Sequence, residues 1–167
     1  MNKMYLVLGD WSNDGHGKYD KVLLESNCSV KDMQNAYKAS CKLTGVEFNH
    51  NDDYTGRDRD WRERENYQIC VNYEDSTLSD DAFAVLSKFG LTKKMLKEWD
   101  ADEMNDDDDE EFALSQDSFV KLWIWFVKLS LPKDTVLQTV DVKDEIPVIN
   151  GYWNKNLNVQ FGYGLYY

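Results

Sequence analysis

The fold of this chain is decided by one apolar stretch, Phe119-Val120-Lys121-Leu122-Trp123-Ile124-Trp125-Phe126-Val127-Lys128-Leu129-Ser130-Leu131. On a helix drawn through it, apolar residues occupy nearly every side, and Lys121 and Lys128 form a narrow polar stripe. A helix that is apolar almost all round is buried in a protein core. We therefore predict a largely buried helix from Phe119 to Leu131, capped at its start by Ser115 or Asp117.

The composition and length of this stretch lead to two expectations. At least two of Trp123, Phe126 and Val127 should be nearly fully buried, because the polar stripe leaves them no exposed side. The stretch has 13 residues and two lysines, whereas a membrane span needs about 20 apolar residues. We therefore expect no membrane association from it.

The rest of the chain adds strands and shorter helices, which predicts one α+β domain. A chain of 167 residues fits one domain and can bury a core without disulfides or metals. We expect a mainly antiparallel sheet of five or six strands packed against three or four helices. Alternating or continuous apolar runs predict strands at 4–8, 21–26, 46–48, 67–73, 135–142, 148–149 and 157–163, and caps with helical spacing predict further helices at 30–44, 80–89 and 92–99.

The N-terminal run and the cysteines indicate a cellular compartment. Met4 to Leu8 is too short for the core of a signal peptide. The three cysteines, Cys28, Cys41 and Cys70, are odd in number and widely spaced, which favours reduced thiols over a disulfide framework or a zinc site. We expect a cytoplasmic protein.

The net charge of −12 is concentrated in one segment. Residues 98–111 hold ten acidic residues and no basic one, so the remainder of the chain carries 19 basic against 21 acidic residues. A nucleic-acid-binding face needs clustered lysine and arginine to neutralise phosphates. We therefore expect no direct binding of nucleic acid.

The acidic segment is the first candidate site. Acidic runs are commonly solvated loops that repel themselves, so we expect a mobile acidic loop at 98–114. Dense carboxylates beside an aromatic residue would also attract a basic protein partner and accelerate its encounter. The residues expected to contact that partner are Glu98, Trp99, Asp100, Asp106, Asp107, Asp108, Asp109, Glu110 and Glu111.

The loop from Asp10 to Gly17 is the second candidate site. Asp10, Ser12 and Asp14 stand at the first, third and fifth positions of an EF-hand-type calcium loop, but Lys21 occupies the twelfth position, where that loop has glutamate. Together with His16 they form a candidate site for Ca²⁺ or another divalent cation. A second polar cluster around His50 and Asp52 would extend it if the two loops met. The alternative is an ordinary turn rich in Asp, Asn and Gly.

Two functions follow from these candidates. The first is a non-enzymatic acidic interaction protein of the inhibitor, immunity or anti-defence kind, bound to a basic partner such as a nuclease or a nucleic-acid-binding enzyme, with no cofactor. The second is a small metal-dependent hydrolase, in which Asp14 would hold the metal and His16 would transfer the proton. A third reading makes both segments plain surface loops. The sequence gives no oligomeric state.

Overall fold

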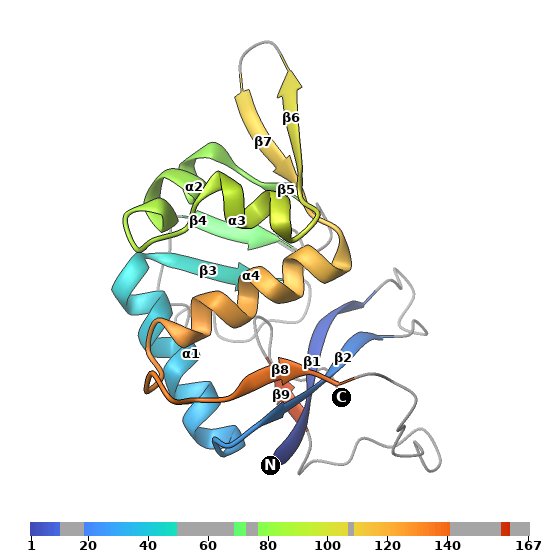
Figure 1. The fold of residues 1–167 in the computed structure, drawn as a ribbon, viewed down its shortest axis with the longest axis vertical. Helices are drawn as coiled ribbons and strands as arrows, with labels where there is room; N and C mark the ends of the chain where they lie inside the picture. The colour runs from blue at the N-terminus through green and yellow to red at the C-terminus, as the bar shows by residue number, and fades with distance from the viewer. Residues whose placement is uncertain (11–18, 50–68, 73–76, 107–108, 141–157, 161–167) are drawn as a thin grey trace, which may run out of the picture.

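The computed structural model of the chain describes residues 1–10, 19–49, 69–72, 77–106, 109–140 and 158–160 (Figure 1). Within them the chain forms four helices and nine strands. The helices are α1 (Val30–Thr44), α2 (Asp80–Ser87), α3 (Lys93–Glu98) and α4 (Gln116–Lys128). The strands are β1 (Asn2–Asp10), β2 (Tyr19–Ser26), β3 (Val46–Asn49), β4 (Ile69–Asn72), β5 (Thr77–Leu78), β6 (Asp102–Asp106), β7 (Asp109–Ala113), β8 (Leu137–Thr139) and β9 (Asn158–Gln160).

The first sheet is built on the predicted N-terminal hairpin. β1 and β2 pair antiparallel, with Met4 opposite Leu24 and a register shift between Val7 and Gly9. β8 lies antiparallel on the outer side of β2, and β9 lies parallel to β1, which gives the order β8-β2-β1-β9. The predicted strands at 4–8 and 21–26 are therefore present, the strand predicted at 135–142 begins later, at Leu137, and the strand predicted at 157–163 is present in its described residues, 158–160.

The predicted α+β fold of helices and mainly antiparallel strands is confirmed, but the strands divide between two sheets instead of forming one sheet of five or six strands. The remaining strands form a second sheet in the order β3-β4-β5-β7-β6, which is antiparallel except for the parallel pair β3 and β4. The reason lies in α4, which runs across the middle of the molecule with the two sheets on different sides (Figure 1). A helix that is apolar almost all round needs cover on several sides, and one sheet covers a single side.

The core is one hydrophobic cluster shared by both sheets and by α1 and α4. Trp123 is 1% exposed and Phe126 and Val127 are 0% exposed, which confirms the predicted burial of all three. The ring of Phe126 contacts the ring of Phe48 on β3 at 4.8 Å and that of Tyr37 on α1 at 6.1 Å between centroids. These contacts join α1, β3 and α4 into one α+β fold.

The helix ends follow the expected local chemistry. Ser29 caps α1 by accepting the Asp32 backbone N–H at 3.1 Å, and Gly45 ends this helix in the left-handed region with φ +75°. Of the two candidate caps of α4, Ser115 holds the position, since its hydroxyl accepts the Ser118 backbone N–H at 3.2 Å. The helix begins earlier than predicted and ends at Lys128, three residues before Leu131.

The segment expected as an acidic loop at 98–114 contains two strands in its described residues. Glu98 ends α3, and the segment then forms the antiparallel strands β6 and β7, which pair from Asp102 opposite Ala113 to Asp106 opposite Asp109. Acidic residues disfavour strands, so the propensity of this segment pointed away from a hairpin. Its tertiary anchors, described below, outweigh that propensity.

The predicted strand at 148–149 falls outside the described residues. In the described part of the chain, no helix combines the length and the apolar character needed to cross a membrane.

Candidate functional site

The candidate site is the hairpin of β6 and β7, called here the acidic hairpin. It extends outward from the body of the molecule beyond α2 and α3 (Figure 1). β6 is the last strand of its sheet, and β7 joins it to the two-residue strand β5. The chain's most acidic segment is therefore carried on an extension of the sheet.

The register of the acidic hairpin places one pair of aspartates directly opposite each other. Asp106 stands opposite Asp109, and Asn105 stands opposite Glu110. Like charges directly opposite across an antiparallel pair are destabilising. The outer half of this hairpin is therefore not stabilised by its own cross-strand charges, and its stability must come from its base.

Phe112 on β7 anchors that base. Its side chain is 0% exposed, and its ring lies 5.3 Å from the ring of Phe83 on α2, measured between centroids. Full burial of a phenylalanine contributes about 1.5–3 kcal/mol. Phe112 stands opposite Glu103, so the same cross-strand pair carries the apolar anchor and a carboxylate.

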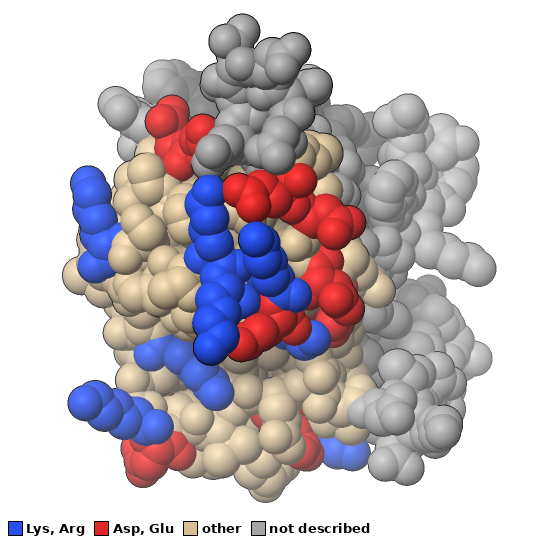
Figure 2. Space-filling view, turned by 45° about the horizontal axis from the view of Figure 1, so that its top comes forward, with Lys and Arg blue, Asp and Glu red and all other residues tan. Residues whose placement is uncertain are grey.

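Lysines of α3 neutralise the base of the hairpin. The Lys93 ammonium donates a hydrogen bond to Glu103 at 2.8 Å and lies 5.9 Å from the centre of the Phe112 ring. Lys97 lies 3.6 Å from the other carboxylate oxygen of Glu103. The hydrogen bond from Lys93 holds the pKa of the Glu103 carboxyl below its usual value, with smaller contributions from the charges of Lys93 and Lys97. Figure 2 shows lysine and carboxylate side chains gathered side by side on this face.

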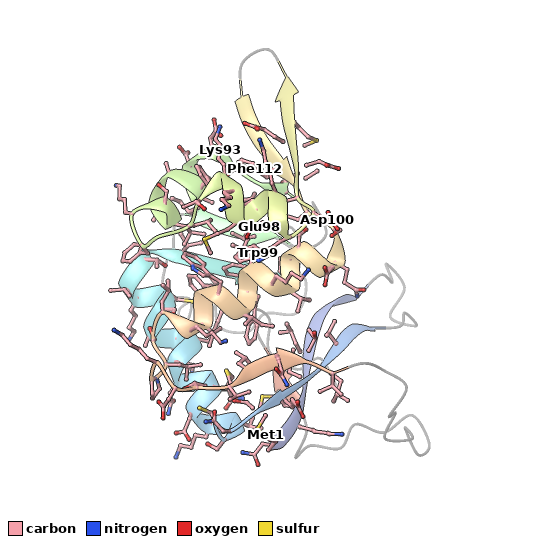
Figure 3. The ribbon with its side chains drawn as sticks, viewed as in Figure 1. Met1, Lys93, Glu98, Trp99, Asp100 and Phe112 are labelled. Atoms are coloured by element: carbon pink, nitrogen blue, oxygen red, sulfur yellow. The ribbon has the colours of Figure 1, made fainter. Side chains whose placement is uncertain are left out.

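The end of α3 carries three of the residues predicted to contact a partner (Figure 3). Glu98 is exposed and lies 3.8 Å from Lys94, one turn earlier, in a mostly solvated ion pair. Asp100 is exposed and has φ +60°, in the left-handed region. Trp99 is half-buried and packs against the core, so only part of its ring is available to a partner.

The structure places the other predicted contact residues by backbone alone. Asp106 ends β6, and Asp109, Glu110 and Glu111 begin β7, whereas residues 107–108 lie outside the described residues. The hairpin therefore places Asp106 directly opposite Asp109. This arrangement can attract a cation or a basic surface.

The prediction from sequence did not include Lys93 and Lys97 in the site, because the acidic segment was counted from Glu98 onward. The position of these lysines in the sequence could have indicated their contact with the acidic segment. Lysines at 93, 94 and 97 on a predicted helix directly precede the acidic run, and short connections keep consecutive elements adjacent in space. The alternation of Phe112 and Leu114, which are both buried, also marked a strand.

The metal hypothesis falls largely outside the described residues. Asp10 is the last residue of β1, and Ser12, Asp14 and His16 belong to residues 11–18, which the structure does not describe; His50 and Asp52 likewise lie outside. Among the side chains that are described, no group of three or more His, Cys, Asp or Glu is arranged to hold a metal. The metal site and the hydrolase therefore stay predictions.

Comparisons with known proteins add no assignment to this geometry. The chain matches no protein-family model, no curated protein and no solved structure.

Proposed function

We propose that this chain is a non-enzymatic acidic interaction protein that binds a basic protein partner through the acidic hairpin. The observation that carries this proposal is the projection of the most acidic segment from the body of the molecule on a two-stranded extension of a sheet (Figure 1). The partner is a protein whose own surface is basic, such as a nuclease or another nucleic-acid-binding enzyme. The chain would then act as an inhibitor or as an immunity or anti-defence protein.

The distribution of charge supports this reading. Lys93 and Lys97 pair with Glu103 at the base of the hairpin. Beyond the base, residues 106–111 are six consecutive acidic residues. The charge that remains is therefore concentrated toward the outer end, where an approaching partner meets it first. Such a field accelerates association with a basic surface by about 10-fold to 1,000-fold.

The lack of a nucleic-acid-binding role belongs to the same proposal. A strongly negative extension repels phosphates and competes with them for a basic surface.

We also propose that the protein is cytoplasmic. Among the described residues neither Cys28 nor Cys41 forms a disulfide, as is usual in a reducing compartment.

A charge-neutralised hairpin tests the proposal. The four substitutions Asp106→Asn, Asp107→Asn, Asp108→Asn and Asp109→Asn should slow association with a partner recovered by affinity capture. Raising the salt concentration should slow the wild type in the same way, because exposed charges act over about 8 Å at physiological ionic strength. Surface plasmon resonance across a salt series should show a fall in the association rate much larger than any rise in the dissociation rate.

The matched control removes the same charge elsewhere. Four exposed carboxylates lie outside the acidic hairpin: Asp80, Asp81, Asp117 and Asp134. Their replacement by Asn removes the same number of negative charges from the protein. This control should leave the association rate close to that of the wild type. The hairpin variant itself should keep or slightly raise its free energy of unfolding, because Asp106 and Asp109 no longer repel. An association rate indifferent to salt and to the hairpin substitutions contradicts the proposal.

A further inference from the structure

We infer that the outer edge of β6 receives an extended, lysine- or arginine-bearing segment of the partner, which adds a strand to the sheet. This inference rests on the proposed function, because the segment belongs to the same basic partner. It goes further by naming the element that binds and the conformation of the bound segment. The mode is β-strand addition, in which main-chain hydrogen bonds give affinity and alternate side chains give specificity.

The position of β6 supplies the first step. In the described sheet β6 is terminal, and β7 pairs with it along its whole length, from Asp102 to Asp106. The outer side of a terminal strand presents N–H and C=O groups of alternate residues, which are a template for another strand. No described hydrogen bond engages the backbone of residues 102–104 on that side.

At the opposite edge of the same sheet, a side chain forms hydrogen bonds with the outward-facing backbone. β3 is the other terminal strand, and the Tyr37 hydroxyl donates to the Phe48 carbonyl at 2.8 Å and accepts the Phe48 N–H at 3.1 Å. One buried side chain thus replaces a strand partner at that edge. The two edges therefore differ: a side chain satisfies backbone groups at the β3 edge, whereas the β6 edge extends away from the core without such a described contact.

Charge selects the occupant of the β6 edge. The strand reads Asp102-Glu103-Met104-Asn105-Asp106, with three acidic residues and no basic one. A second copy of the same edge would set like charges opposite one another, which is destabilising, whereas a basic strand would set opposite charges there. Asp102 is exposed, and Met104 is 39% exposed, so a carboxylate and an apolar contact are both available to the incoming segment.

The test uses the full chain labelled with ¹⁵N and three synthetic peptides. The first is Lys-Thr-Lys-Thr-Lys-Thr-Lys; the second is the same peptide N-methylated at two adjacent central residues, which blocks both of its edges without changing its charge; the third has Glu in place of Lys. The first peptide should shift the amide resonances of β6 and slow their hydrogen exchange. The methylated peptide should bind at least about tenfold more weakly, and the Glu peptide should not bind.

A pair of protein variants locates the contact. Asp102→Lys should weaken binding of the lysine peptide about threefold or more, whereas Asp81→Lys, at another exposed carboxylate on α2, should leave binding unchanged. Equal affinity for the methylated and unmodified peptides would mean charge attraction without strand addition and would overturn the inference while leaving the proposed function intact. Absence of binding by the lysine peptide also overturns it, as does protection of β6 amides that disappears on dilution, which would identify a second copy as the occupant.

Discussion

At the scale of single residues, the Tyr37 hydroxyl makes two hydrogen bonds to the backbone of one buried strand residue, Phe48. It satisfies both the N–H and the C=O of Phe48, at 3.1 and 2.8 Å, while Tyr37 and Phe48 are both buried. Two buried backbone groups would lose their partner without it, and each such loss is destabilising by about 1–3 kcal/mol. The hydroxyl therefore closes the β3 edge from within.

Tyr37→Phe should lower the free energy of unfolding by about 2–4 kcal/mol, measured by urea denaturation. The control is Ser87→Ala, which removes a hydroxyl that donates to the Ala84 carbonyl at 2.8 Å on an exposed helix surface. The control should change stability by less than about 0.5 kcal/mol. Equal effects of the two substitutions would show that Tyr37 does not close the edge.

From the buried position of the Tyr37 hydroxyl we predict how the free energy of unfolding changes at alkaline pH. Burial raises the pKa of Tyr37 well above its usual value, with a smaller contribution from Cys41. In the unfolded chain the tyrosine loses its proton near pH 10. The stabilisation is therefore complete below about pH 10 and is lost as the pH rises toward the folded pKa. The difference in stability between the wild type and Tyr37→Phe should narrow above about pH 10; a constant difference would contradict this assignment.

Asp100 is a second residue whose backbone sets its effect. It lies two residues after the end of α3, in the left-handed region at φ +60°, and the next backbone N–H, of Ala101, donates to the Leu96 carbonyl at 3.0 Å. Gly90 holds the corresponding position after α2, at φ +108°, with the Leu91 N–H bonded to the Leu86 carbonyl at 3.3 Å. The two ends share one hydrogen-bonding pattern but differ in the residue that adopts the positive φ.

Asp100→Gly should raise the free energy of unfolding by about 0.5–1 kcal/mol, because glycine adopts positive φ without a steric penalty. The reciprocal change, Gly90→Asp, should lower stability by a similar amount or more. A Cβ at Gly90 would meet no atom within 4 Å, so the backbone conformation alone decides that effect. Thermal unfolding of both variants provides the measurement, and two unchanged melting temperatures would contradict the argument.

At the scale of elements, α4 organises the molecule because it supplies apolar side chains to several neighbours at once. Its Phe119 ring lies 5.6 Å from Phe48 on β3, and its Phe126 ring contacts Tyr37 on α1. Trp123 is among the largest fully buried side chains of the protein. Removal of a large side chain from such a position leaves a cavity as well as losing its transfer free energy.

Trp123→Ala should therefore lower the free energy of unfolding by about 3–5 kcal/mol. Trp125→Ala provides a matched control on the same helix, because Trp125 is only partly buried against the core. The control should show a clearly smaller loss in chemical denaturation. Unchanged stability in Trp123→Ala would contradict the role of α4 as the central element.

At the scale of the whole molecule, the tertiary structure redistributes a charge that is one-sided in sequence. Residues 98–111 contain ten acidic residues and no basic one. In the structure, however, Lys93 and Lys97 of α3 form ion pairs with Glu103. Lys94 pairs with Glu98 one turn later on the same helix. Exposed ion pairs of this kind are each worth about 0.2–1 kcal/mol. Their main effect is therefore to reduce the negative charge near the base of the acidic hairpin rather than to stabilise the fold.

The candidate site was predictable in composition but not in shape. The acidic residues and the aromatic residues beside them are read directly from the chain. Their conformation was predicted as a loop, because acidic residues have low strand propensity and repel one another. The hairpin forms nevertheless, since burial of Phe112 beside Phe83 and the contacts of Glu103 with Lys93 depend on α2 and α3. Local propensity contains no information about those partners.

Features that depend on neighbouring residues along the chain were predictable from the amino-acid order. The caps at Ser29 and Ser115 were predictable, as was the turn at Gly45, because each uses hydrogen bonds or dihedral angles within a few residues. Burial of Trp123 followed from the periodicity of α4 in the same way. The division of the strands into two sheets and the edge position of β6 were not predictable in this way and emerge from the folded structure. Strand pairing joins residues far apart in sequence, and its free energy comes from side chains that local periodicity does not identify.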